Sequence, residues 1–577
     1  MSKVICLALL ASTIFIFSPP NGGDTDIWWH LKYGEHFVKN YTLQIDHSIF
    51  SWTIANPDWK YVTWLASSLL YLFYTAAGFP GIFILHSFLF ILIFVLYILY
   101  IRLIGKKLDI PDIFCMLLVA LSANSPYIKP DSFTTLFFAI AVFVYFYSKT
   151  ASKSIFLLYI PLFLIWVNTH GGFIIGLFFI TLTFMLEAVN YYLIKKSSLS
   201  KNSMKDLALS VFMSYAITAI NPYGPQYISS IFRDLYLSDY MEQSKYLYSF
   251  LSIWKQLLPT SDFLGLTFVG WYLMVEFVIL ILVLVFTFSR IKKIDPVIIV
   301  INIVFFLIAM FNARSAKLFP IIWLFSIASI SNTCKFYIPQ KKIAMVSLFL
   351  FVLFTAIRIE VILIFNNHNS WLGRDFIISS TPEKESAFIT NYKLPGPIFN
   401  DYSTGGYMIW SLYPKYKVFI DPRYGPYTNE LRSDCFESSI APNQKTIHYL
   451  YNKYKFNSVF LSLTHPMVKP FMDSPDWKLV YFCTQAAVFI RSELYELNKA
   501  AFNSVDLCPD RFSRVNDPSV LMHIFNLYNY MSLTREMSVI RSIYERNVSN
   551  YYLMKSNNLY IMDFILKIKS NLKESLQ

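Results

Sequence analysis

The first polar segment of the chain combines residue types that could do chemistry. The stretch GGDTDIWWHLKYG places carboxylates at Asp24 and Asp26, followed by Trp28, Trp29 and His30. A carboxylate there could act as a general base toward an acceptor hydroxyl. The pair could instead hold a divalent cation, since hard cations prefer oxygen ligands. A third interpretation is a helix cap followed by aromatic residues at a membrane interface. Spacing alone leaves all three open.

Cations in short turns between apolar stretches form a second group of candidates. Arg314 and Lys317 share one such turn, and Lys129 lies in another. Cations are disfavoured in extracytoplasmic turns, so their presence there suggests an anionic partner such as a phosphate, which Arg can contact with two hydrogen bonds. The alternative is that these long side chains simply reach the lipid head groups.

A histidine between two apolar stretches is the third candidate. His170 follows Asn168 and precedes Gly171 and Gly172. Glycines allow a ligand or another backbone to approach closely, and an imidazole can exchange protons near neutral pH. A role of His170 and Asn168 in a site competes with a buried histidine that only hydrogen-bonds to Asn168 or to a carbonyl group.

Two glutamates fall inside apolar stretches, where an ionisable group is costly and usually faces the interior of a helix bundle. Glu276 is near the middle of its stretch and is the better functional candidate, while Glu187 is closer to an end. If neutral, either could instead hydrogen-bond to a neighbouring helix.

The elements that must position these residues are largely apolar. Of 577 residues, 55% are hydrophobic and only 15% are charged, whereas a soluble domain has roughly 25% charged residues. This composition excludes a soluble enzyme, a disordered scaffold and a nucleic-acid binder, despite a net charge of +13. Stretches able to cross ~30 Å of hydrocarbon predict eleven spans. They are expected near 5–18, 80–103, 111–125, 131–148, 154–168, 172–194, 206–220, 267–289, 295–312, 316–332 and 343–358.

The distribution of Lys and Arg predicts the topology. Alternate short connections are enriched in these cations, which assigns those connections to the cytoplasm. With eleven spans, and with 5–18 as a retained helix rather than a signal peptide, the N-terminus is cytoplasmic and the chain after about 359 is extracytoplasmic. Residues 62–78 must then lie along the interface as a helix instead of crossing the membrane. We therefore expect an integral protein of the plasma membrane, the inner membrane in a bacterium.

The last third of the chain is more polar. It alternates short β-type runs with helical stretches, which predicts an α/β domain over 366–500 and a helical segment over 501–577, after a transmembrane domain over 1–365 with its first outer loop at 19–79. The β-type runs are expected at 397–401, 417–421, 458–463, 479–482 and 487–491.

Polar motifs follow the first two of these runs. Asp401 and Ser403 stand after one, and Asp421 and Arg423 end the other. If both runs are strands, the motifs share one sheet edge, where a sugar could bind. The alternative is that Asp401 or Ser403 caps the following helix while Asp421 pairs with Arg423.

The cysteines of the sequence follow no recognisable pattern, and no nucleotide-binding motif is present. The six cysteines form no CxxC pair, no zinc-type spacing and no disulfide framework. No phosphate-binding glycine motif occurs in a suitable context. The sequence requires no cofactor, although a divalent metal at the first loop is compatible with it, and it gives no oligomeric state.

Several motifs together resemble a known superfamily. The acidic Asp24-Thr25-Asp26 resembles the first-loop motif of the GT-C superfamily of polytopic, lipid-phosphate-sugar-dependent glycosyltransferases. Within it, the chain is similar to bacterial membrane proteins allied to the protein mannosyltransferase and RgtA-like branches. The motifs that carry this closer resemblance are DIWWHL from Asp26 with Gly34, WVNTHGGF from Trp166, NPYG from Asn221, NDYSTGGY from Asn400 and VFIDPR from Val418. One departure is Thr63 before Trp64, where relatives often carry Glu, so Asp58 or Asp46 would have to supply a second loop acid.

The resemblance implies a reaction and roles for residues. The reaction is inverting transfer of a hexosyl or pentosyl group from a polyprenyl-phosphate donor to an acceptor at the extracytoplasmic face. The essential acid maps to Asp26, or to Asp24, with His170 as an auxiliary. The donor and membrane lipid are the expected partners, with no nucleic acid. The residues expected to bind substrate are Arg314, Lys317, Lys129, Trp28, Trp29, His30 and Asn168.

Two other classes of protein remain as alternatives. One is a transporter or flippase for a lipid-linked glycan, which would need ionisable groups through the bilayer and preferably internal repeats. The other is a non-catalytic, glycan-binding protein of envelope assembly.

Overall fold

The computed structural model divides the chain into two compact units. It describes residues 26–53, 56, 59–123, 129–151, 153–195, 197–236, 264–286, 294–311, 313–334, 381–423, 425–497, 502, 508–513, 515 and 518–546. The first unit comprises the described residues within His30–Ile45 and Asp58–Thr355. The second comprises those of Thr25–Trp29, Asp46–Pro57 and Ala356–Gln577, so it includes two short pieces of the loop over 19–79.

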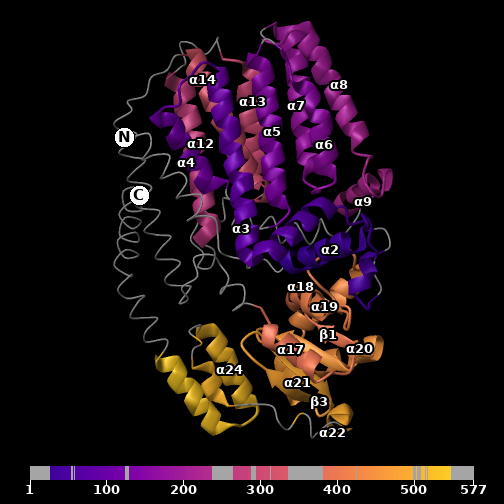
Figure 1. Ribbon diagram of the computed structural model, residues 1–577. Coiled ribbons are helices and arrows are strands. Elements are labelled where there is room, and N and C mark those ends of the chain that lie inside the picture. Colours follow the sequence, from indigo (N-terminus) through magenta and orange to yellow (C-terminus); the bar gives the residue numbers. More distant parts are fainter. Residues whose placement is uncertain are drawn as a thin grey trace. The chain divides into compact units, whose positions relative to one another are not determined.

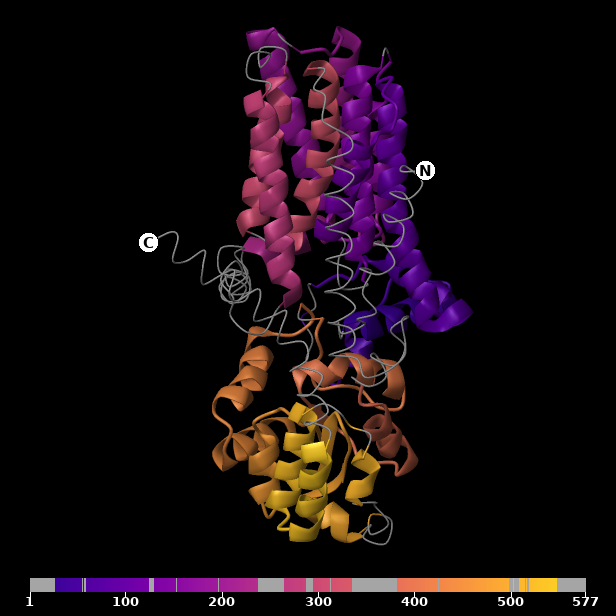
Figure 2. The same cartoon turned by 90° about the vertical axis from the view of Figure 1, so that its left-hand side faces the viewer.

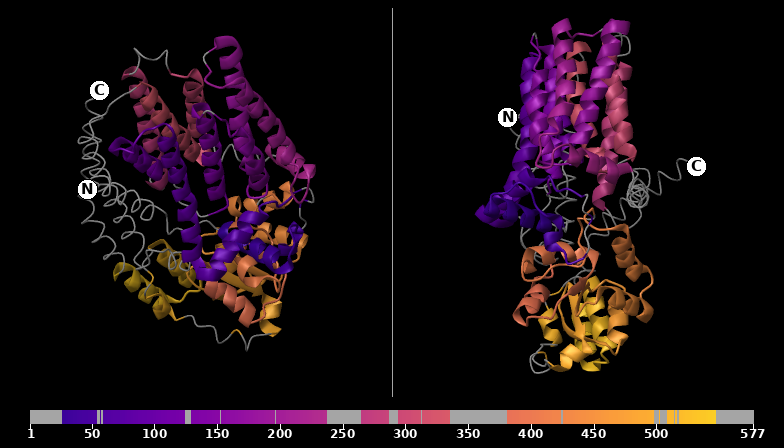
Figure 3. Two further views of the ribbon diagram at one scale, coloured as in Figure 1. Left: turned by 45° about the horizontal axis from the view of Figure 1, so that its top comes forward. Right: turned by 90° about the vertical axis from the view of Figure 1, so that its right-hand side faces the viewer.

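The first unit is a bundle of apolar helices (Figure 1). Its helices are α2 (Asp26–Asn40), α3 (Trp64–Leu103), α4 (Ile110–Ser122), α5 (Asp131–Thr150), α6 (Tyr159–Val167), α7 (Phe173–Val189), α8 (Lys201–Ile217), α9 (Pro225–Tyr236), α12 (Leu264–Phe286), α13 (Pro296–Phe311) and α14 (Phe319–Cys334). Helix α14 lies against α3, α4, α5, α12 and α13, and its Trp323 is fully buried. Several helices run side by side in both views of Figure 3, as expected when apolar faces must be covered by other helices.

Helix α3 is broken near its middle. Gly78 has non-helical dihedral angles (φ 64°, ψ −147°), and Pro80 follows inside the helix. A positive φ suits glycine, and proline lacks the N–H that would continue the helical hydrogen bonds. The break separates the stretch expected at the interface, 62–78, from the expected span 80–103.

The bundle has the lengths and composition of a membrane protein. Four described helical segments are long and apolar enough to cross a membrane: Trp64–Leu103, Asp131–Thr150, Phe173–Ile194 and Ser315–Cys334. Shorter apolar helices occur at Ile110–Ser122, Phe156–Val167, Met274–Val285 and Pro296–Met310. The expected span 206–220 largely coincides with α8, whereas 5–18 and 343–358 lie outside the described residues. Eleven spans therefore stay a prediction.

The second unit is built on a mixed four-stranded sheet. Its strands β1 (Ile398–Asn400), β2 (Ser458–Ser462), β3 (Trp477–Phe482) and β4 (Ala486–Arg491) lie in the order β1-β2-β4-β3. Strands β1 and β2 are parallel, and the other two pairings are antiparallel. The helices are α17 (Glu383–Asn391), α18 (Tyr402–Leu412), α19 (Asn429–Ile440), α20 (Gln444–Tyr454), α21 (Val468–Asp473), α22 (Ser492–Leu497) and α24 (Pro518–Tyr530). Figure 2 shows α24, in yellow, beside this sheet.

The strand expected at 417–421 does not form. Within it only Val418 makes a β-bridge, to Ser51. The Asn400 side chain takes the next backbone groups, because its Oδ1 accepts from Phe419 N at 2.7 Å and its Nδ2 donates to Ile420 O at 2.7 Å. Backbone groups satisfied by an amide side chain need no strand partner.

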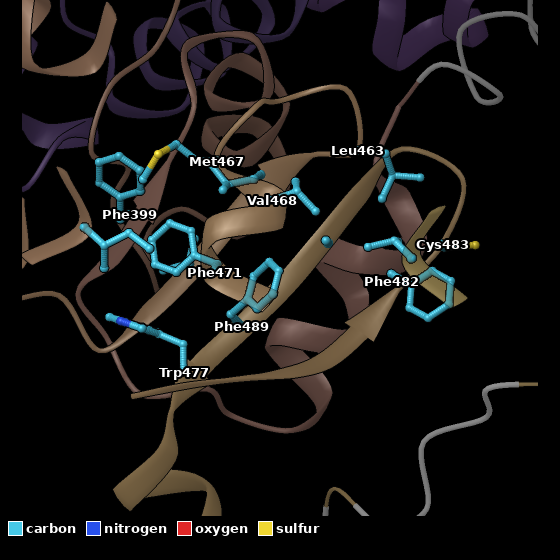
Figure 4. Packing of buried hydrophobic residues seen from close by; sticks show 14 of the residues in the cluster. Phe399, Leu463, Met467, Val468, Phe471, Trp477, Phe482, Cys483 and Phe489 are labelled. Atoms are coloured by element: carbon cyan, nitrogen blue, oxygen red, sulfur yellow. The ribbon is translucent and has the colours of Figure 1, made fainter. Parts of the chain in front are cut away.

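The core of the second unit is rich in aromatic residues (Figure 4). Phe471 and Phe456 pack against Trp477, with ring centroids 5.3 Å and 5.2 Å away. Phe489 of β4 lies 5.6 Å from Phe471. Rings in such offset and edge-to-face arrangements bury large apolar areas, and they hold α20 and α21 against the sheet.

Candidate functional site

Helix α2 presents a buried histidine to the start of α3. His30 is 6% exposed, and its Nδ1 lies 2.9 Å from the Tyr61 hydroxyl and 3.4 Å from Ser67 Oγ. The Tyr61 and Ser67 hydroxyls are themselves 2.5 Å apart. Three polar groups thus satisfy one another at the contact between α2 and α3.

The close approach of these two helices depends on Gly34. A Cβ atom at Gly34 would lie 2.1 Å from the carbonyl oxygen of Ser67 and 2.7 Å from Tyr71 Cβ. The motif spacing from His30 to Gly34 is one helical turn, so both residues face α3. This geometry explains why the sequence motif contains a glycine.

We expect Gly34→Ala to destabilise the bundle. The added methyl group must displace backbone, and overpacking of this kind costs about 1–3 kcal/mol. The measurement is the thermal midpoint of the full chain in detergent. Gly171→Ala is the matched control, because a Cβ there meets only the Tyr227 hydroxyl at 3.5 Å. Equal midpoints for the two variants would contradict the packing assignment.

A second polar group is centred on Thr134 of α5. Its hydroxyl lies 2.8 Å from His170 Nδ1 and accepts a hydrogen bond from Trp166 Nε1 at 3.0 Å. The Gly172 N–H donates to His170 Nδ1 at 3.1 Å. Since Nδ1 accepts from a backbone N–H, the neutral ring carries its proton on Nε2. Residues of the WVNTHGGF motif therefore converge on a threonine that no motif contains.

The carboxylate of Asp131 lies near Lys317 and Lys129. Lys317 Nζ donates to Asp131 Oδ2 at 2.5 Å, and both side chains are largely buried. The second carboxylate oxygen, Oδ1, is buried and has no hydrogen-bond partner among the described residues. Lys129 and His170 are also close enough to act electrostatically on Asp131.

The same charges act on His30. Burial, and next His170 and Lys129, hold the pKa of His30 well below its usual value, and Asp131 only partly opposes them. His30, Lys129, Asp131, His170 and Lys317 therefore form one electrostatic neighbourhood, which we call the bundle-end cluster. Lys317 pairs with Asp131 there, Lys129 acts electrostatically on the same carboxylate, and His30 is neutral near pH 7.

We expect acid to destabilise the protein through His30. The folded state binds this proton less readily than the unfolded state, so stability is complete above about pH 6.5 and is lost progressively as the pH falls below that value. The measurement is the thermal midpoint between pH 5 and 8 for the full chain and for His30→Gln, in which this loss should be smaller. His448→Gln, at an exposed position of α20, is the control. A His30→Gln profile identical to the wild type would contradict the assignment.

Other predicted site residues have different surroundings. Asp24 lies outside the described residues, and for Arg314 only the backbone is described, in the turn Ala313–Leu318. Asn168 Oδ1 accepts from Trp64 Nε1 at 3.0 Å, and its Nδ2 donates to Leu164 O and Ile220 O. These bonds tie the end of α6 to neighbouring segments, so Asn168 has a clear structural task.

The acidic end of α2 belongs to the second unit. Asp26 begins α2, one turn before His30, and its Oδ1 accepts from Trp29 Nε1 at 3.2 Å. Trp28 lies against Tyr407 of α18, with ring centroids 4.8 Å apart, and against Trp410 at 6.1 Å. Among the residues that the structure describes, no three His, Cys, Asp or Glu side chains gather as a metal site.

The polar motifs of the second unit form a helix cap and an ion pair, which was the alternative to sugar binding. Asp401 caps α18, accepting from Thr404 N at 2.9 Å, and also accepts from Ser462 N at 2.5 Å. Arg423 makes two hydrogen bonds of 2.7 Å to Asp421. Asp401, Asp421 and Arg423 are all buried, so they stabilise the domain at the edge where the sequence left sugar binding open.

The two glutamates in apolar helices are buried and hydrogen-bonded. Ser122 Oγ donates to Glu276 Oε1 at 2.6 Å, which joins α12 to α4. Glu187 accepts from the Tyr145 hydroxyl at 2.6 Å and pairs with Lys149. Both therefore connect neighbouring segments of the bundle.

Sequence reasoning missed Asp131, Thr134, Tyr61 and Ser67. For Asp131 a signal existed, because it follows Lys129 and Pro130 in a turn already selected for its cation. Tyr61, Ser67 and Thr134 belong to common residue types without special spacing.

Comparisons with known proteins found similar structures but no match in sequence. No family model matches the chain, and no curated protein matches it in sequence. ArnT from Cupriavidus metallidurans, solved with undecaprenyl phosphate, is similar with a TM-score of 0.46 and 10% identity, covering 85% of this chain and 97% of that one. The archaeal oligosaccharyltransferase AglB from Archaeoglobus fulgidus, solved with an inhibitory peptide and a dolichol-phosphate, has a TM-score of 0.45 and 11% identity, covering 96% and 86%.

Both proteins belong to the GT-C superfamily that the sequence motifs resemble. With TM-scores below 0.5 and identities near 10%, no residue role or reaction is carried over from them.

Proposed function

We propose that this chain is an integral membrane glycosyltransferase that moves a sugar from a polyprenyl-phosphate donor to an acceptor at the extracytoplasmic face. The observation that carries the proposal is the bundle-end cluster, in which Lys317 pairs with Asp131 while Lys129 and His170 act electrostatically on the same carboxylate. Two ammonium groups in one largely buried place suit an anion such as a lipid phosphate.

In the proposed reaction Asp26 acts as the general base, with Asp24 as the alternative. It accepts the proton of the acceptor hydroxyl while that oxygen forms a bond to the anomeric carbon of the sugar. The bond from this carbon to the phosphate oxygen breaks, and polyprenyl phosphate leaves with the electron pair. Attack opposite to the leaving phosphate inverts the anomeric configuration, for a hexosyl or a pentosyl group alike.

The cations would stabilise the phosphate as it leaves. Lys317 and Arg314 from one turn, with Lys129 from another, would neutralise its developing charge. The Nε2–H of His170 would donate a hydrogen bond to the phosphate or to the sugar. Trp28, Trp29 and His30 would hold the substrates from α2.

The experiment is mass spectrometry of lipid-linked sugars. A strain lacking the gene should accumulate one sugar-linked polyprenyl phosphate. Purified protein in liposomes with that lipid extract and the cell-envelope acceptor should convert it to polyprenyl phosphate. A sugar lipid that reaches the other leaflet intact would indicate the transporter, and a lipid that stays unchanged and in place would indicate a non-catalytic protein.

A further inference from the structure

A groove in the second unit carries side chains that no motif includes. It has a volume of about 830 Å³ and is lined by α20, by Ser474 and Asp476, by Trp477 of β3 and by Arg491 of β4. Ligand pockets for small molecules commonly have volumes of about 300–1,000 Å³. The groove therefore has room for a short oligosaccharide.

The face of α20 that borders the groove carries polar and aromatic side chains. Gln444, Ile447, His448, Tyr451 and Asn452 recur at the spacing of one helix face. Ile447 is buried in the core, whereas Gln444, His448 and Asn452 are exposed. The amide and imidazole groups of this face can form hydrogen bonds, and the Tyr451 ring provides apolar area. A sugar ring has both hydroxyl groups and apolar area to match them.

Arg491 lies over a tyrosine ring at the wall of the groove. Its guanidinium carbon lies 4.3 Å from the centroid of the Tyr451 ring, and its Nε pairs with Glu493 Oε1 at 3.0 Å. The ring centroid of Trp477 lies 6.3 Å from that of Tyr451. A guanidinium held by a ring and an ion pair can bind a carboxylate or phosphate through its planar N–H groups.

The charges of the lining favour an acidic ligand. Lys445, Lys453 and Arg491 line the groove against one carboxylate, Asp476. Lys453 is already paired with Asp434 and Glu430, neither of which lines the groove. Arg491 forms its ion pair with the largely exposed Glu493, and an exposed pair of this kind is weak enough for the acid group of a ligand to compete. Lys445 and Arg491 are therefore the cations for a ligand.

We infer that this groove binds an acidic oligosaccharide, one whose sugars carry carboxylate or phosphate groups. Its acid group pairs with Arg491 and Lys445, and its hydroxyls bond to Gln444, His448 and Asn452. This places glycan recognition on the α20 side of the domain and away from the buried Asp401 and Asp421. The inference does not depend on the proposed transfer reaction, because binding needs no donor.

The test is binding of trigalacturonic acid to the full chain in nanodiscs, followed by saturation-transfer NMR, with the neutral maltotriose as the comparison. We expect trigalacturonic acid to bind at least tenfold more tightly. Arg491→Gln and Lys445→Gln should each weaken it at least fivefold, and the exposed position of Lys445 makes loss of folding no explanation for the second variant. Lys417→Gln, which removes a charge outside the groove, should not change the affinity.

Three results would overturn the inference. They are no binding of trigalacturonic acid to folded protein, equal binding of both trisaccharides, and an affinity unchanged in both groove variants. Binding of a peptide in this groove, with neither sugar bound, would replace the saccharide by a protein partner. Because no donor is present, none of these results bears on whether the chain transfers sugar.

Discussion

Replacing Asp26 by Asn should lower the turnover of the reconstituted protein at least about 100-fold. Proton transfer by a positioned side chain contributes roughly 10²–10⁴-fold to a rate, and asparagine cannot accept the proton. The Trp29 indole can still donate to the amide oxygen at this position, so the local fold should persist. Turnover is measured as release of polyprenyl phosphate, together with a thermal midpoint for each variant.

Asp24→Asn and Asp473→Asn complete this experiment. Asp473 is exposed and pairs with Lys469 at the end of α21, so its replacement should leave turnover unchanged. A large loss in Asp24→Asn alone would move the base to Asp24. Unchanged turnover in both loop variants would end the catalytic assignment of this loop.

Replacing Lys317 by Met should raise the donor concentration for half-maximal rate by about tenfold or more. A hydrogen bond to a charged group contributes roughly 1.5–3 kcal/mol, and one factor of ten corresponds to about 1.4 kcal/mol. Lys317→Arg keeps the positive charge and should recover much of the loss. The measurement is the rate as a function of donor concentration.

A paired variant separates phosphate binding from folding. Lys317→Met alone leaves the buried Asp131 without its cation, which is itself destabilising. Lys317→Met with Asp131→Asn removes both charges, so the thermal midpoint should recover while the donor affinity stays low. Donor affinity that recovers with the midpoint would show that Lys317 serves only Asp131. Lys469→Met with Asp473→Asn is the matched control on an exposed pair.

Much of the helical fold could be predicted because its signals are local. The expected span 131–148 is α5 (Asp131–Thr150), and the expected strand 487–491 is β4 (Ala486–Arg491). Burial of long apolar stretches needs no knowledge of partners. The strand expected at 417–421 is wrong because a distant residue decides the structure there. The run Val-Phe-Ile favours a strand by itself, but the Asn400 side chain forms hydrogen bonds with the backbone of Phe419 and Ile420.

The site could be predicted in part for a similar reason. Lys317 stands out because cations are disfavoured in extracytoplasmic turns, and His170 because it lies between two apolar stretches beside Asn168 and two glycines. Thr134 and Ser67 are ordinary in a helix, and only the tertiary structure shows that one meets His170 and the other His30. The sequence therefore indicates ionisable groups in apolar surroundings better than the common hydroxyl groups that hydrogen-bond to them.

The break at Gly78 bears on how the two parts of α3 are oriented. An unbroken helix of 40 residues would be about 60 Å long at ~1.5 Å per residue, twice the thickness of the hydrocarbon layer. Ser67, which contacts His30, lies before the break, and the long apolar run lies after it. The break therefore lets the later part of α3 take the direction set by its packing against α5 and α14, independently of the contact between Ser67 and His30.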